Sequence, residues 1–173
     1  MTKVSATFIF LWTSLTSNVL TGAQNQKGVD VKLEAKSGSK VSGQLKLIPQ
    51  KGGVMIMGAV TGLNPNQEHG FHVHETGDCS AADGASAGGH FNPHGASHGD
   101  SSKTGHLGDL GNLKADKQGH VKVSVLVNGA TLDGGKSGIS GRALVIHGQR
   151  DDLKTQPAGN AGPRVACGVI PKV

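Results

Sequence analysis

Apolar and polar residues alternate with a period of two along several short stretches of the chain. In 29–35, Val29, Val31 and Leu33 alternate with charged residues, and in 121–127 four valines alternate with Lys122, Ser124 and Leu126. Similar short stretches occupy 41–48, 54–60 and 142–147. Such alternation predicts strands with one face in a core, and no window shows sustained helical periodicity. Many short antiparallel strands at regular intervals predict an all-β sandwich or barrel.

One further predicted strand carries histidines on one of its faces. Phe71 and Val73 alternate with His72 and His74, so the apolar residues point one way and the imidazoles the other. The following residues, up to about 109, are mostly Gly, Ser, Ala, Asp and His, which bury too little apolar area to fix a loop. Seven of the nine histidines of the chain lie between His69 and His106.

Bound metal would order a loop that apolar packing cannot hold. The loop provides nitrogen and oxygen ligands typical of a tetrahedral zinc site, namely His90, His98, His106 and Asp109. His72 and His74 offer only imidazole, which suits copper as well as zinc. The alternative is an unstructured histidine-rich tract that binds metal loosely. The unequal spacing of the histidines and the aspartate at the end favour a structured site.

Two long motifs resemble those of one known family. Gly70-Phe71-His72-Val73-His74-Glu75, then His90-Phe91-Asn92-Pro93, His98, His106 and Gly108-Asp109, resemble the metal-binding region of copper/zinc superoxide dismutases. Residues 159–170 resemble the second signature of that family, around an arginine and a disulfide cysteine. The resemblance extends from about Val29 to Ile170. It implies an antiparallel Greek-key β-barrel or sandwich of about eight strands with two long functional loops.

The resemblance also implies a site with two metals. Copper would be bound by four histidines and zinc by three histidines and an aspartate, with His90 bridging them. Asp151 would link ligand histidines of the two sites, and Arg164 would be the catalytic residue that binds the anion. His69 is expected to be packed and hydrogen-bonded, and His94 to be a solvated loop residue. The implied ligands are His72, His74, His90 and His147 for copper, and His90, His98, His106 and Asp109 for zinc.

The sequence contains two cysteines, Cys79 and Cys167. In an exported protein an even pair predicts a disulfide, with free buried thiols as the alternative. The family resemblance agrees with the disulfide, which would tie the metal-binding loop to the strand that bears Arg164.

Residues 1–23 have the features of a secretory signal peptide: Lys3, an apolar run over 6–12 and small residues at 21–23. Polar residues between 13 and 18 interrupt the segment well before the length of a membrane span. We therefore expect one domain over 24–173, exported to a periplasm or the extracellular space. Loss of Lys3 leaves 16 basic residues against 12 acidic ones, so the mature chain stays basic.

The implied activity is conversion of superoxide to oxygen and hydrogen peroxide by redox cycling of copper, with structural zinc, which would protect against oxidative stress. The substrate partner is the superoxide anion, and we expect no nucleic-acid partner.

The loop from Asp151 to Arg164 is shorter than in cytosolic eukaryotic members and resembles that of exported bacterial forms. The residues that guide substrate in the cytosolic members therefore have no assigned counterparts in this loop. Lys103, Arg150 and Lys154 are candidates for that role. A homodimer is compatible with the family, whose branches use different faces. The alternatives are a metal storage or delivery module and a non-catalytic adhesion sandwich, and neither explains a complete ligand set.

Overall fold

The computed structural model describes residues 27–173 together with Met1, so residues 2–23 of the expected signal peptide lie outside the described residues. It contains eight strands and one short 3-10 helix. The elements are β1 (Val29–Ala35), β2 (Ser42–Gln50), β3 (Gly53–Thr61), β4 (Glu68–His74), η1 (Ala85–Ala87), β5 (Asp109–Lys114), β6 (Val121–Asn128), β7 (Ala143–His147) and β8 (Arg164–Val169).

The eight strands form one antiparallel sheet in the order β5-β4-β7-β8-β1-β2-β3-β6. β1 joins the two halves of the sheet, because its first residues pair with β2 while Glu34 and Ala35 pair with β8. The edge strands β5 and β6 also contact each other, so the sheet nearly closes into a barrel. β4, β5 and β6 follow one another, and β7 returns to pair with β4, which is a Greek-key arrangement. The predicted all-β Greek-key fold is confirmed.

The barrel interior is filled by aliphatic side chains that the alternating strands direct inward. Leu33, Leu47, Ile56, Leu144 and Ile146 have no exposed surface. Burying one such side chain stabilises the folded state by roughly 1.5–3 kcal/mol, so these five side chains make a large favourable contribution to the free energy of folding. Phe91 of the histidine-bearing loop belongs to the same core, so the loop is packed onto the barrel at that residue.

Periodicity did not reveal β5 and β8, and the structure shows why. β5 places only Leu113 well inside the apolar core, contains Gly111 at φ 80°, and begins with the buried carboxylate of Asp109. In β8 three consecutive residues, Ala166 to Gly168, are buried, so polar and apolar positions cannot alternate. Both strands form through pairing with their neighbours, and neither has the one-sided apolar pattern by which a strand can be recognised in the sequence.

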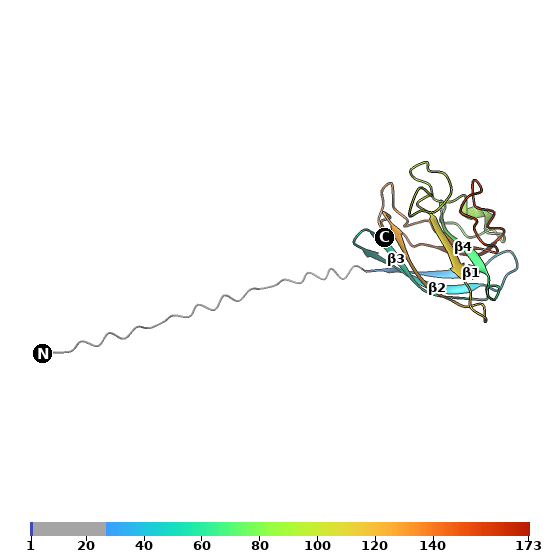
Figure 1. Ribbon diagram of the computed structural model, residues 1–173, viewed down its shortest axis with the longest axis horizontal. Helices are drawn as coiled ribbons and strands as arrows, with labels where there is room; N and C mark the ends of the chain where they lie inside the picture. Colours follow the sequence, from blue (N-terminus) through green and yellow to red (C-terminus); the bar gives the residue numbers. More distant parts are fainter. Residues whose placement is uncertain (2–26) are drawn as a thin grey trace.

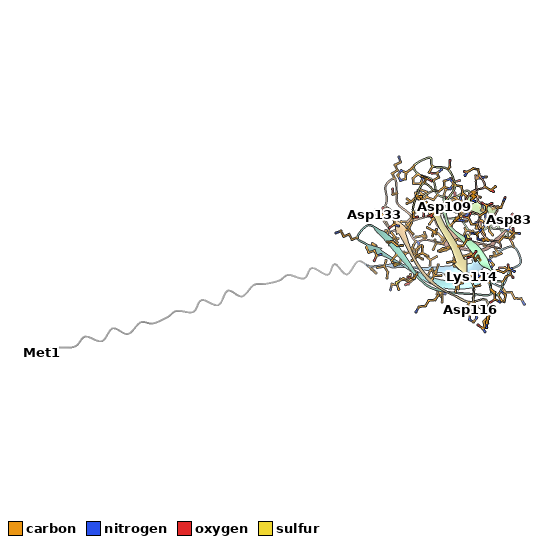
Figure 2. All side chains as sticks on the ribbon, viewed as in Figure 1. Met1, Asp83, Asp109, Lys114, Asp116 and Asp133 are labelled. Atoms are coloured by element: carbon orange, nitrogen blue, oxygen red, sulfur yellow. A yellow bond between two sulfur atoms is a disulfide. The ribbon has the colours of Figure 1, made fainter. Side chains whose placement is uncertain are left out.

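The segments that follow β4 and precede β8 gather at the same end of the barrel, seen at the top of Figure 1. Figure 2 shows Asp109 near that end, with Lys114 and Asp116 toward the opposite end. In the described part of the chain, no helix has the length and apolar character needed to cross a bilayer.

Candidate metal centre

Strand pairing brings the predicted site residues together. His72 in β4 lies opposite Asp109 in β5, and His147 at the end of β7 lies opposite Arg164 at the start of β8. Irregularities in pairing occur next to both contacts, between Gly70 and His72 and between Ile146 and His147. Such bulges re-aim side chains at a sheet's functional end.

Four histidines form the first buried cluster, with ring nitrogens all within 4.8 Å of one another: His72, His74, His90 and His147. In two of them the Nδ1–H donates to a backbone carbonyl, from His74 to Gly88 at 2.9 Å and from His147 to Gly162 at 3.1 Å. This leaves an Nε2 lone pair on each ring, and the two Nε2 atoms face each other at 3.4 Å. Two lone pairs at this distance repel unless a cation or a proton lies between them, so the cluster fits a metal ion bound by imidazole nitrogens.

The second cluster is built around the carboxylate of Asp109. Its Oδ1 lies 2.8 Å from Nδ1 of His90 and 3.1 Å from Nδ1 of His106, while Oδ2 lies 3.1 Å from Nδ1 of His98. Oδ2 also accepts the backbone N–H groups of Gly99 and His106. Three imidazole nitrogens and one oriented carboxylate are the ligand set of a closed tetrahedral zinc site.

His90 belongs to both clusters. Its Nδ1 points to Asp109, whereas its Nε2 is buried without a hydrogen-bond partner. Nδ1 of His72 and Nδ1 of His98 are likewise buried without such a partner. A buried polar atom without a hydrogen-bond partner costs free energy. Each of these three atoms belongs to a histidine of the two ligand clusters. Metal ions in both clusters would satisfy all three atoms.

Asp151 connects the two clusters from outside. Its Oδ2 accepts Nε2–H of His72 at 2.8 Å, and its Oδ1 accepts Nε2–H of His98 at 2.9 Å. Each bond places the ring proton on Nε2 and thereby leaves Nδ1 free to act as a ligand. Gly159 lies against this carboxylate: a Cβ there would be 1.8 Å from Oδ1 of Asp151, and φ is +66°. Only glycine fits at that position.

Burial keeps His72 and His147 neutral, whereas hydrogen bonds keep Asp109 charged. Burial lowers the pKa of His72 to about 4 and that of His147 to about 3. Burial alone would raise the pKa of Asp109, but hydrogen bonds from His90 and from backbone N–H groups outweigh it and lower the pKa below its usual range. Neutral imidazoles and ionised carboxylates are the protonation states that metal binding requires.

Arg164 is positioned by carbonyl groups of the loop that carries Cys79. Its guanidinium donates to the carbonyl oxygens of Gly84 and Gly88. The Gly88 oxygen also accepts the Nδ1–H of His74, so one peptide group orients both a cluster histidine and the arginine. Burial lowers the pKa of Arg164, but a guanidinium stays protonated in proteins.

A disulfide between Cys79 and Cys167 fixes that loop to β8, as expected. Around it lies a second, small apolar cluster made of Ala87, Ala143, Val145 and Cys167, with Cys79 against it. The loop is thus held by a covalent bond and by packing, which together hold the Gly84 and Gly88 carbonyls beside Arg164.

Other residues singled out in the sequence lie outside the two clusters. His69 is buried, and its Nδ1 bonds to the His147 carbonyl at 2.9 Å, in agreement with a packed role. His94 is exposed, 3.4 Å from the Ser137 hydroxyl. Of the three candidate guiding cations, Arg150 pairs with Glu68 and Lys103 lies 3.8 Å from Asp100. Sequence reasoning missed Gly88 and Gly159. Gly159 lies within the second signature, whereas Gly88 lies outside both motifs.

The fold and site define a class: a Greek-key barrel with two adjoining buried ligand clusters that share one histidine. Comparison with known proteins then specifies the family. Residues 41–170 match the family described as copper/zinc superoxide dismutase. Two copper/zinc superoxide dismutases of Aquifex aeolicus are each 46% identical to this chain. The first match extends over 136 residues and covers 76% of this chain and 80% of the relative. The second extends over 140 residues and covers 78% of this chain and 82% of the relative. One from Schizosaccharomyces pombe is 42% identical over 76% of this chain and 90% of the relative.

Solved structures agree with the sequence relatives. The crystal structure of a SOD-like protein from Bacillus subtilis is 35% identical, with a TM-score of 0.75, covering 83% of this chain and 99% of that one. The clock protein EA4 is 38% identical, with a TM-score of 0.72, covering 83% of this chain and 93% of that one. The chain belongs to the copper/zinc superoxide dismutase family. It is an oxidoreductase that converts superoxide to oxygen and hydrogen peroxide, and its cofactors are copper and zinc.

Proposed function

We propose that each metal of this dismutase occupies one of the two clusters. Copper would be held by the four-histidine cluster, because imidazole alone suits copper. Zinc would be held by the cluster that contains Asp109, because three imidazoles and a carboxylate suit tetrahedral zinc. The observation that carries this assignment is His90, whose Nδ1 lies in one cluster while its buried Nε2, without a hydrogen-bond partner, lies in the other.

Arg164 is proposed as the residue that binds substrate. A guanidinium stays charged and offers several donors, so it suits a small anion, and the Gly84 and Gly88 carbonyls hold it beside the His74 ring. Copper held by the four histidines would supply the change of oxidation state that lets one superoxide be oxidised and a second be reduced, and zinc, which has no redox chemistry, would order the loop. Two superoxide ions and two protons thereby give one oxygen and one hydrogen peroxide, a reaction that protects against oxidative stress.

Replacing one unshared ligand of each cluster tests the assignment. His147→Ala should lose copper and its visible absorption band while retaining zinc, and His106→Ala should lose zinc while retaining copper. His94→Ala, an exposed histidine of the same loop, is the control and should retain both metals. Elemental analysis after dialysis measures the content. Retention of copper with an unchanged band in His147→Ala would show the copper assignment to be wrong.

We propose in addition that the enzyme is exported and that residues 1–23 are removed. The Cys79–Cys167 disulfide supports this, because such bonds persist in oxidising compartments outside the cytosol. N-terminal sequencing of the protein purified from the medium or periplasm of an expressing cell should begin at Gln24. Protein confined to the cytosol with Met1 intact would contradict export.

A further inference from the structure

The side-chain amide of Gln156 clasps the backbone of His98. Its Oε1 accepts the His98 N–H at 2.8 Å, and its Nε2 donates to the His98 carbonyl at 3.0 Å. The amide has one acceptor and one donor group, so it pairs with both backbone groups as a neighbouring strand would. The same Nε2 lies 3.2 Å from the Lys154 carbonyl, which anchors the side chain to its own loop.

This clasp holds the backbone of His98, a buried histidine of the second cluster. Among residues 27–173, Gln156 is the hydrogen-bond partner of both the N–H and the carbonyl of His98, and no other protein group bonds to either. The ring of His98 is held separately, with Nε2 bonded to Asp151 and Nδ1 3.1 Å from Asp109. The segment around His98 has little apolar burial, since only Phe91 of residues 91–106 belongs to the core. Loss of the clasp would therefore leave His98 held by its ring alone.

We propose that Gln156 is a positioning residue for zinc, which keeps Nδ1 of His98 in the ligand cluster and thereby slows zinc release. This inference rests on the proposed zinc assignment of His98. Gln156 is an exposed residue outside the cluster, so it acts through the His98 peptide groups and not through charge or burial.

The chemistry of the amide makes the role testable with two substitutions. Gln156→Ala removes both bonds. Gln156→Glu keeps an acceptor for the His98 N–H but replaces the donor with a second carboxylate oxygen, which faces the His98 carbonyl and repels it. Outer contacts to metal ligands typically change metal affinity by about 10- to 100-fold. Because Gln156 is exposed, we expect the lower end, about tenfold faster zinc release, in both variants.

Zinc release from the metal-filled enzyme into an excess of the chromophoric chelator 4-(2-pyridylazo)resorcinol provides the measurement. Lys154→Ala is the matched control, because it changes an exposed side chain of the same loop and keeps the carbonyl that Gln156 contacts. Its release rate should equal the native rate. A native rate in Gln156→Ala would overturn the proposal.

A second readout separates positioning of the ligand from general bracing of the loop. Cobalt(II) placed in the zinc site reports ligand geometry through its visible absorption. We expect the cobalt bands to shift in Gln156→Ala and to stay unchanged in Lys154→Ala. Cobalt bands of Gln156→Ala that match the native bands would overturn action through His98.

The same set of variants distinguishes this inference from the assignment on which it rests. If His98→Ala and His106→Ala leave zinc affinity unchanged, the zinc assignment itself is wrong. If those two variants lose zinc while Gln156→Ala releases it at the native rate, only the role of Gln156 is wrong.

Discussion

Nε2 of His72 lies 2.8 Å from Oδ2 of Asp151, and neither side chain has any exposed surface. The second oxygen of the same carboxylate bonds to His98 in the other cluster. One buried carboxylate therefore sets the tautomer of a ring in each cluster, and the two proposed metal sites share an orienting group as well as the bridging His90.

Replacing Asp151 should weaken both sites at once. In Asp151→Asn one oxygen becomes an amide nitrogen, which cannot accept a ring N–H, so one of the two imidazoles must change tautomer or turn. We expect affinity for copper and for zinc to fall about 10- to 100-fold. Competition titration with chelators measures both affinities. Asp152→Asn, a neighbour whose carboxylate bonds to Thr155 instead, should be native-like, and native affinities in Asp151→Asn would contradict the orienting role.

Removal of His90 should affect both metals more strongly than removal of any unshared ligand. His90→Ala deletes a nitrogen from each cluster, and we expect each affinity to fall by more than about 100-fold, beyond the effect usual for outer contacts. The loop up to Asp109 should also become more sensitive to proteolysis. Normal binding of either metal to this variant, judged by titration beside His94→Ala, would exclude His90 as the shared ligand.

Reduction of the Cys79–Cys167 bond should destabilise the metal-free enzyme more than the metal-filled one. The disulfide closes a separation of 88 residues, for which chain entropy gives at most about 4.5 kcal/mol. In the metal-filled enzyme the ligands also fix this loop in the folded state, so less is lost. Urea unfolding of native protein and of Cys79→Ser with Cys167→Ser, each with and without metals, measures the difference. Equal losses in both forms would argue against this coupling.

Stability of the metal-free enzyme should fall as the pH drops below about 6.5. Burial lowers the folded-state pKa of His72 to about 4 and of His147 to about 3, whereas an unfolded histidine titrates near 6.5. Between those values the unfolded chain binds more protons, so the free energy of unfolding decreases with falling pH, by at most about 1.4 kcal/mol per pH unit for each ring. Urea midpoints between pH 7 and pH 4 test this. A stability that stays constant over that range would mean that these rings are not buried in the neutral form.

The charge of Arg164 should govern both the rate and its dependence on salt. A hydrogen bond to a charged group contributes roughly 1.5–3 kcal/mol, so Arg164→Ala should lower kcat/KM about 10- to 100-fold with both metals retained. Arg164→Glu should lower it further, because it repels the anion. Added salt screens both effects, so it should slow the native enzyme and narrow the gap to the Glu variant. A Glu variant as active as the native enzyme at low salt would exclude Arg164 from the mechanism.

The sequence predicted most of the fold because β1, β2, β3 and β6 carry a pattern that follows from one-sided burial. β4 and β7 are buried on both faces, and β4 was still found because its apolar residues alternate with buried histidines. Val31 and Leu33 in β1 alternate with exposed charges, and the valines of β6 alternate with exposed residues. β5 could not be found this way, because Asp109 and Gly111 occupy positions where an apolar alternation would be expected. Likewise β8 lacks alternation because both of its faces are covered.

The candidate ligands were also predictable, since histidines within a motif are visible in any sequence. The groups that position them were not. The carbonyl of Gly88 that holds both His74 and Arg164 is a backbone atom, and the clasp of Gln156 on His98 joins residues 58 positions apart. Contacts of this kind depend on how two loops meet above the barrel, and neither loop has a periodic pattern from which its path could be inferred.

The close contact between Gly159 and Asp151 limits how the length of this loop can vary. Gly159 must stay against the carboxylate, and Arg164 must still reach the carbonyls of Gly84 and Gly88. The segment from 159 to 164 is therefore a spacer of fixed length, in which an insertion or a deletion would displace the arginine from the copper cluster. Differences in loop length that keep the Gln156 clasp on His98 must instead fall between Pro157 and Ala158. An engineered dismutase with a longer loop should receive its extra residues there.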